Sequence, residues 1–203
     1  MLNTESHGFN WTEREPDSVG LMFGAILAEL RTTGAKSVVD LGCGNGAIAS
    51  RLASAGFTVH GIDADAKGIR VAQGRKSGAT FERGSFQKPS SRAFDAAISS
   101  EVIEHLYAPH ELIRYAASCL APGGRFIVTT PYHGYLKNFV IAALGKWDSH
   151  TGPDFHGGHI KFFSKRSLTK MLEAGGFTVE RFRGVGRAPY LWHSMVLTAV
   201  RNG

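Results

Sequence analysis

Two glutamates and a histidine stand close together in the stretch SSEVIEHLY, which covers residues 99–107. Glu101, Glu104 and His105 are spaced at i, i+3 and i+4, so on a helix their side chains would share one face. Carboxylate oxygens and an imidazole nitrogen suit a hard or borderline divalent cation such as Mg, Mn, Fe or Zn. The same residue types also suit acid–base catalysis, with His105 as the general base and a neighbouring carboxylate that orients it.

A third interpretation of this motif is structural: the two glutamates would bind a cofactor or hold a loop, with His105 packed beneath them. The metal site needs a further ligand, and His156 or His159 in the stretch FHGGHIKFF would supply it. Four of the nine histidines fall between residues 132 and 163, namely His133, His150, His156 and His159. This crowding favours the metal site, while the other two interpretations stay open.

A glycine-rich turn lies upstream, in VVDLGCGNGAIA. Gly42, Gly44 and Ala47 fit the G-x-G-x-x-G/A pattern of dinucleotide-binding turns. Asp63 ends the next expected strand, where a carboxylate can accept hydrogen bonds from ribose hydroxyls. Asp40, two residues before Gly42, would repel a pyrophosphate and attract a cation. The turn therefore favours S-adenosylmethionine, which carries an ammonium and a sulfonium but no phosphate.

The elements that must position these residues alternate along the chain. Apolar runs predict strands at 37–42, 58–63, 79–85, 94–100 and 125–130, and helical patterns lie at 16–34, 47–56, 65–76 and 109–120. Continuous apolar strands that alternate with helices indicate a parallel sheet covered on both faces. Ligands of such sheets bind at the carboxyl ends of the strands, where Asp40, Asp63 and Glu101 all lie.

The alternation breaks between residues 132 and 163, where only a short helix at 136–144 is expected. So long an irregular segment inside a compact domain favours a functional lid. Its aromatic residues, which we expect to form an apolar pocket, are Tyr132, Tyr135, Trp147, Phe155 and Phe162. A last helix follows, with Ser164 as its N-cap and Gly175 as its stop. Two strands at 177–185 and 194–201 should then pair as a hairpin at the sheet edge, so residues 1–203 form one domain.

Composition agrees with a single domain of 203 residues, of which 43% are hydrophobic and 20% charged. The two cysteines, Cys43 and Cys119, do not suggest a disulfide framework, and the first residues lack the pattern of a signal peptide. The longest apolar run is too short to cross a bilayer, so we expect a cytoplasmic protein with no membrane span. The stretch between residues 67 and 92 holds seven basic residues and a single acidic one, Glu82. Because no aromatic residues are interleaved with these charges, a solvated surface is favoured over a nucleic-acid contact.

Four motifs, in order, resemble the class I S-adenosylmethionine-dependent methyltransferases: VVDLGCGNG, GID, FDAAISSEVIEHL and LAPGGRFIVTTP. They extend from about residue 37 to residue 131, and the later SLTKMLEAGGFTVE resembles the last helix and following strand of that family. The resemblance implies an α/β fold with a Rossmann-like, seven-stranded, mostly parallel sheet. Helices would cover both faces, and the last strand would be antiparallel.

The same resemblance assigns residues to the cofactor. Asp40, Gly42 and Gly44 would line its methionine end, and Asp63 would bind its ribose. Many relatives have an acidic residue near the adenine, whereas this chain has RGSFQ there. Ser85 and Phe86 would take that place, and Ser100, at the end of a strand, would complete the cofactor site.

The stretch EVIEH and the later TTP are similar to the ubiquinone-pathway O-methyltransferases. An E-x-x-E-H cluster with a later histidine before a Lys/Phe-rich run also resembles the small-RNA 3′-terminal 2′-O-methyltransferases. That resemblance implies that Glu101, Glu104, His105 and His159 bind a divalent cation that chelates two vicinal oxygens of the acceptor.

We therefore expect O-methylation of a small vicinal-diol or catechol-like acceptor, with His105 and Glu104 as catalytic residues. An RNA ribose 2′-O-methyltransferase and a non-catalytic S-adenosylmethionine-binding protein are the alternatives. The sequence indicates no particular oligomeric state.

Overall fold

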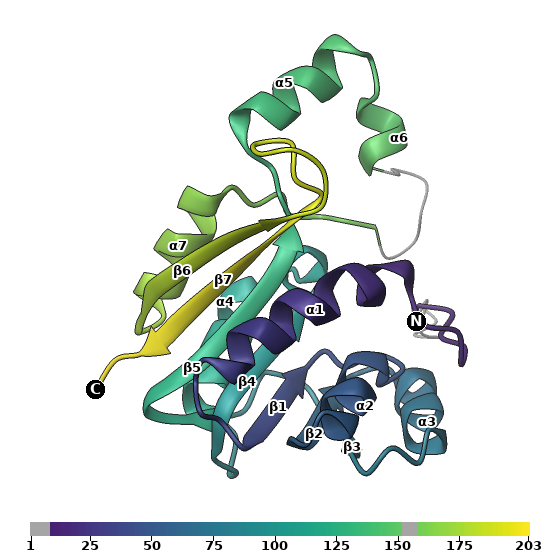
Figure 1. Ribbon diagram of the computed structural model, residues 1–203, viewed down its shortest axis with the longest axis vertical. Helices are drawn as coiled ribbons and strands as arrows, with labels where there is room; N and C mark the ends of the chain where they lie inside the picture. The colour runs from purple at the N-terminus through teal and green to yellow at the C-terminus, as the bar shows by residue number, and fades with distance from the viewer. Residues whose placement is uncertain (1–8, 152–157) are drawn as a thin grey trace, which may run out of the picture.

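The computed structural model describes residues 9–151 and 158–203, whose strands form one seven-stranded sheet in the order β3-β2-β1-β4-β5-β7-β6 (Figure 1). The strands are β1 (Ser37–Leu41), β2 (Thr58–Asp63), β3 (Thr80–Arg83), β4 (Phe94–Ser100), β5 (Leu120–Pro131), β6 (Phe177–Val185) and β7 (Ser194–Arg201). Strands β1 to β5 pair in parallel, and β7 runs antiparallel to both β5 and β6. The expected Rossmann-like fold with an antiparallel last strand is confirmed.

Helices cover both faces of this sheet. They are α1 (Asp17–Arg31), α2 (Ala47–Ser54), α3 (Ala66–Gly74), α4 (Pro109–Cys119) and α7 (Lys165–Ala174). Neighbouring strand residues point to opposite faces, so Val38 packs into a cluster with α1 and α2, whereas Val39 packs into a second cluster with α4 and α7. Both sides of the central strands are therefore buried, which explains their continuous apolar runs.

The last helix and hairpin form as the sequence predicts. The Ser164 side chain accepts a hydrogen bond from the backbone of Ser167 and so caps α7, and Gly175 stands at its C-terminus. Strands β6 and β7 pair antiparallel, with β7 inserted beside β5. No described helix has the length and apolar character needed to cross a bilayer. Both cysteines are free thiols.

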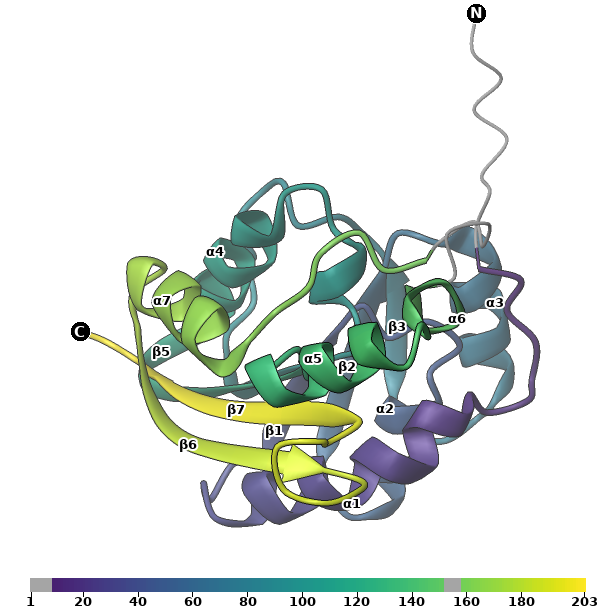
Figure 2. The same cartoon turned by 90° about the horizontal axis from the view of Figure 1, so that it is seen from above.

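The segment between residues 132 and 163 forms α5 (Tyr135–Ala143) and α6 (Trp147–Thr151), which project beyond the carboxyl ends of the strands (Figures 1 and 2). The expected short helix is confirmed as α5, and α6 was not predicted. The prediction of an apolar pocket is wrong, because Tyr135 and Trp147 are exposed on this projection and Phe162, which follows it in the chain, is exposed as well. Tyr132 is buried, and Phe155 lies outside the described residues.

Candidate active site

A cavity of about 1040 Å³ opens at the carboxyl ends of the strands. Its lining includes all seven residues expected at the cofactor: Asp40, Gly42, Gly44, Asp63, Ser85, Phe86 and Ser100. They come from the ends of β1, β2, β3 and β4, which lie far apart in the sequence and adjacent in the sheet. Glu101, His105 and His159 line the same cavity.

The glycine-rich turn has a backbone that only glycine fits. Gly42 has φ +82°, and a Cβ atom added there would lie 2.5 Å from Cγ2 of Val102. Gly44 has φ +51°, and an added Cβ would lie 2.6 Å from the ring of Trp11. Any side chain at these positions would strain the backbone and collide with a neighbour.

The turn places two carboxylates in the cavity wall. Burial, followed by the charge of Asp63, raises the pKa of Asp40 to about 7. Burial also raises the pKa of Asp63, although its two oxygens accept hydrogen bonds from the amides of Gly44 and Asp65, each at 2.8 Å. A positively charged group beside Asp40 would stabilise its ionised form, so the cavity suits a cationic ligand.

Residues 9–16, called here the N-terminal strap, cover the cavity, and the sequence analysis missed them. Trp11 packs over Gly44, and the ring of Phe9 meets that of His105 edge-on at 5.1 Å. Asn45 fastens the strap by donating hydrogen bonds to the carbonyls of Thr12 and Arg14 at 2.8 and 2.9 Å. The one sequence feature that could have indicated this strap is the pair of aromatic residues in FNW, just before the first helix.

Several members of the basic stretch between residues 67 and 92 also hold local structure. Lys67 donates to the side chain of Asn10, and Arg75 donates to the carbonyl oxygens of Glu13 and Asn45. Part of this basic stretch therefore holds the N-terminal residues in place, and the less favoured alternative, a nucleic-acid contact, stays untested.

The motif EVIEH differs from the helix considered in the sequence analysis. Only a 3₁₀ turn, η1 (Ile103–His105), forms, and Glu101 precedes it with φ +54° in the left-handed region. The Oε1 atom of Glu101 accepts a hydrogen bond from Thr129 at 2.8 Å, and its Oε2 atom accepts one from Ser194 at 3.1 Å. These bonds turn Glu101 toward β5 and β7, away from the face that it was expected to share.

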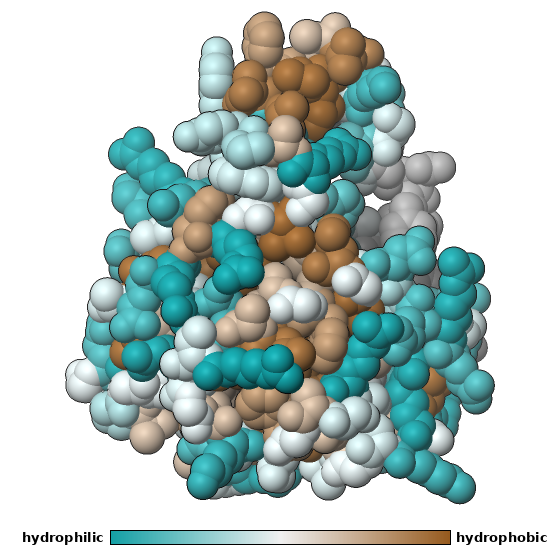
Figure 3. Space-filling view, viewed as in Figure 1, coloured by the Kyte–Doolittle hydropathy of each residue, from teal (hydrophilic) through white to brown (hydrophobic). Residues whose placement is uncertain are grey.

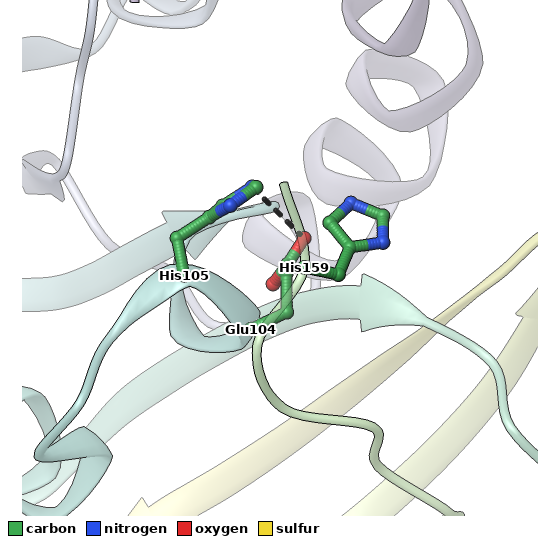
Figure 4. A group of neighbouring side chains, drawn as sticks. All are labelled: Glu104, His105 and His159. Carbon is green, nitrogen blue, oxygen red and sulfur yellow. Dashed lines mark ion pairs between the residues drawn. The ribbon is translucent and has the colours of Figure 1, made fainter. Parts of the chain in front are cut away.

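Glu104 instead points into the protein and is only 1% exposed. Thr130 donates a hydrogen bond to its Oε2 atom at 2.9 Å, whereas Oε1 has no hydrogen-bond partner among the described residues. The Nε2 atom of His105 lies 3.9 Å from Oε1 (Figure 4). A buried carboxylate oxygen without a partner is costly, so this atom marks a place where a ligand would be stabilising.

The backbone carries His159 to the same place. The amides of Ile160 and Lys161 donate to the carbonyl of Glu104 at 2.9 and 3.0 Å. The rings of His105 and His159 then lie 5.0 Å apart, and Glu104, His105 and His159 each offer a ligand atom within 4.8 Å of the others (Figure 4). The structure thus brings together three of the four expected metal ligands, without Glu101; His156 lies outside the described residues.

The pKa values of Glu104 and His159 suit the binding of a cation. Burial, reinforced by the charge of Glu101, raises the pKa of Glu104 well above its ordinary value. Burial and then His105 lower the pKa of His159 to about 4, so this imidazole is neutral at pH 7. A neutral imidazole is ready to ligate, and a positive partner would allow Glu104 to ionise.

Comparison with known proteins now identifies the family. Residues 20–181 match the family model described as methyltransferase domain. The chain belongs to the class I S-adenosylmethionine-dependent methyltransferases. This membership agrees with the seven-stranded fold and with the acidic residues at the ends of β1 and β2.

Two curated relatives are 32% and 30% identical to this methyltransferase over the aligned residues. The ubiquinone biosynthesis O-methyltransferase of Methylobacterium nodulans is 32% identical over 165 residues, covering 74% of this chain and 63% of that protein. The mitochondrial ubiquinone biosynthesis O-methyltransferase of Mus musculus is 30% identical over 175 residues, covering 77% of this chain and 45% of that protein. The chain therefore spans less than two thirds of the length of each.

Among solved structures, the methyltransferase domain of bacterial CtHen1 superposes with a TM-score of 0.70 and 22% identity. The match covers 91% of this methyltransferase and 100% of that chain. It shows that the two share a fold.

Proposed function

We propose that this methyltransferase transfers the methyl group of S-adenosylmethionine to an oxygen of a small acceptor with vicinal hydroxyls, such as a catechol, with the help of a divalent cation. The observation that carries the proposal is the convergence of Glu104, His105 and His159 beside the cofactor cavity. The names of the curated relatives support oxygen as the methylated atom.

The residues present fit a cation. The Nδ1 atom of His105 lies 3.2 Å from the carbonyl oxygen of Gly158 and donates to it, which leaves Nε2 as the nitrogen that carries the lone pair. Metal-binding histidines commonly donate their other nitrogen to a carbonyl in this way. A cation held by Glu104, His105 and His159 would lower the pKa of an acceptor hydroxyl at neutral pH.

The chain's own residues position the reactants. Asp40 would face the ammonium of the cofactor, and Asp63 would accept from its ribose hydroxyls, which fixes the methyl group near the end of β4. The N-terminal strap contributes Phe9 and Trp11 to the cavity wall, and these rings would limit the access of water to the bound cofactor. An acceptor held beside Glu104 would then present its oxygen in line with the departing sulfur, and this proximity supplies much of the rate.

A mechanism without a metal has one specific observation in its favour. The same Gly158 hydrogen bond leaves Nε2 of His105 able to accept the acceptor's proton, with Glu104 3.9 Å away to stabilise the charged ring. RNA ribose 2′-O-methylation and non-catalytic binding of S-adenosylmethionine remain alternative functions, which the turnover assay described below would distinguish from the proposed one.

We also propose that residues 1–203 form one methyltransferase domain in which the segment between 132 and 163 is a lid. The buried free thiols of Cys43 and Cys119 support a reducing, cytoplasmic location.

The test is formation of S-adenosylhomocysteine from S-adenosylmethionine and catechol. Exhaustive chelation should abolish turnover, and adding Mg, Mn, Fe or Zn singly should restore it, in an order that reveals hard or borderline preference. Glu104→Gln and His159→Ala should lose activity while they bind the cofactor normally. The matched controls are Glu173→Gln and His110→Ala, because both residues are exposed and neither belongs to the group or lines the cavity.

Full turnover after chelation would exclude the cation. His105→Ala then decides between the remaining interpretations, because a general base contributes on the order of a hundredfold or more. A much smaller loss would leave the motif with a structural role.

A further inference from the structure

Helix α5 buries a lysine and exposes its large apolar side chains, which is the reverse of the usual arrangement. Lys137 is its buried residue, 4% exposed, whereas Tyr135 is 86% exposed and Phe139 is 59% exposed. Figure 3 shows apolar residues gathered on the outside of the α5–α6 projection. Helices normally bury their apolar face, and lysine is almost never buried unless it is paired. An inverted helix that costs stability indicates that the buried lysine has a function.

The ammonium of Lys137 is poorly satisfied. Its Nζ atom donates one hydrogen bond, to the carbonyl oxygen of His193 at 3.2 Å. Within residues 9–151 and 158–203, no carboxylate lies within 4.0 Å of it. An ammonium has three hydrogens to donate, so two of them have no acceptor among the described residues.

The guanidinium of Arg187 adds positive charge near Lys137. Burial and then the charge of Arg187 lower its pKa to about 8, so it stays mainly protonated at pH 7. Burial, followed by the charge of Lys137, lowers the pKa of both His150 and His193, so these two neighbours are mainly neutral at pH 7. Glu101 partly offsets the charge, but the hydroxyls of Thr129 and Ser194 already hold its oxygens.

This cationic group adjoins the acceptor end of the cavity. His193, whose carbonyl binds Lys137, lines the cavity, as do Glu101 and His159. Each of these three is electrostatically coupled to Lys137. Lys137 does not itself line the cavity, but a molecule beside Glu104 and His159 would lie next to His193, whose carbonyl oxygen holds the ammonium.

We propose that the methyl acceptor carries an oxyanion, a carboxylate or a phosphate, and that Lys137 binds it together with Arg187 and His193. The inference rests on the proposed function, because the acceptor must occupy the end of the cavity beside Glu104. A buried ammonium without a counter-charge is unfavourable, and an anionic ligand supplies both the charge and the acceptors that Lys137 lacks. The acceptor is then a hydroxylated acid or a phosphorylated diol.

Binding of matched probes tests this inference without turnover. Calorimetry with S-adenosylhomocysteine present would compare 3,4-dihydroxybenzoate with its uncharged amide, and ribose 5-phosphate with ribose. The first pair detects a carboxylate site and the second a phosphate site. We expect one anionic probe to bind about tenfold or more tightly than its neutral partner, as for a hydrogen bond to a charged group.

The variant Lys137→Met should abolish this preference and leave affinity for the neutral probe unchanged. It should also fold and melt at the same or a higher temperature, because replacing a buried charge by an apolar side chain is often stabilising. Lys146→Met, which changes an exposed lysine between α5 and α6, is the matched control and should keep the preference.

Three outcomes would overturn the inference. They are equal binding within both pairs, no binding of either anion at millimolar concentration, and a preference that survives Lys137→Met. Failure of the proposed function has a different signature. None of catechol, 3,4-dihydroxybenzoate and its amide would then yield S-adenosylhomocysteine under any metal condition, even where the anionic probe binds more tightly than its neutral partner.

Discussion

The hydroxyl of Thr130 donates a hydrogen bond to Oε2 of Glu104 at 2.9 Å, and no described residue donates one to Oε1 of the same carboxylate. The preceding residue, Thr129, donates in the same way to Glu101. Successive side chains of a strand point to opposite faces, so two consecutive threonines of β5 hold the two glutamates apart. The arrangement leaves one buried oxygen of Glu104 directed toward His105.

Thr130→Val tests whether this hydroxyl positions Glu104. The substitution keeps the shape and removes the donor, so the carboxylate should lose its orientation. We expect kcat for catechol to fall about 10- to 100-fold, as for other residues that orient ligating or catalytic side chains. Affinity for S-adenosylmethionine, measured by calorimetry, should not change.

The control is Thr169→Val, because the hydroxyl of Thr169 is buried and has no hydrogen-bond partner among the described residues. It should keep full activity. A Thr130→Val enzyme with normal kcat and normal metal dependence would show that Glu104 needs no such support.

The strands, and the convergence on one cavity of the residues expected at the cofactor, could be predicted because their signals are local. A buried parallel strand is a continuous apolar run, and the ends of such strands meet at one edge, which brought Asp40 and Asp63 together. The geometry of Glu101 could not be predicted, because hydroxyls from β5 and β7 fix it. The donors on these strands, Thr129 and Ser194, lie far from Glu101 along the chain.

Lys137 and Trp11 escaped the sequence analysis for related reasons. Amphipathic periodicity places lysine outside a helix, and α5 breaks that rule. Trp11 belongs to the N-terminal strap, whose attachment depends on Asn45 and other residues after the first helix. Both positions depend on contacts between segments that are distant in sequence.

Asp40→Asn should stabilise the ligand-free protein at alkaline pH. The carboxyl of Asp40 has a pKa of about 7 in the fold, above the unfolded value of about 3.9, so the folded state binds more protons. Stability is therefore lost as pH rises between these values, by about 1.4 kcal/mol per pH unit. Urea unfolding should find the variant more stable than the wild type at pH 8 and nearly equal to it at pH 4.

The same variant should bind S-adenosylmethionine at least tenfold more weakly at pH 8, since the cofactor's ammonium loses a charged partner. Asp148→Asn, on the exposed part of α6, should change neither quantity. An Asp40→Asn effect on stability of equal size at both pH values would show that the residue acts by packing and not by its charge.

Asn45→Ala should release the N-terminal strap. The substitution removes both hydrogen bonds to the carbonyls of Thr12 and Arg14 and changes no residue of the strap itself. Two lost bonds should speed dissociation of S-adenosylhomocysteine about tenfold or more, at about 1 kcal/mol for each bond. Stopped-flow displacement monitored by tryptophan fluorescence would measure that rate.

Gln73→Ala removes a hydrogen bond from α3 to the carbonyl of Phe81 and leaves the strap bonds intact, so it should keep the wild-type rate. An unchanged dissociation rate in Asn45→Ala would mean that the cofactor leaves without moving the strap.

The projection formed by α5 and α6 should be mobile in the empty enzyme and should close on the acceptor. Its aromatic side chains are exposed and Lys137 is the buried residue of α5, so little apolar burial opposes local opening. An acceptor bound beside His159 and Lys137 would tie the projection to the cavity. Hydrogen exchange of peptides from residues 135–151 should slow when S-adenosylhomocysteine and 3,4-dihydroxybenzoate are added together, and much less with either alone. Peptides from α7 serve as the internal control, and equal exchange of α5 and α6 in all four states would make the projection a fixed part of the domain.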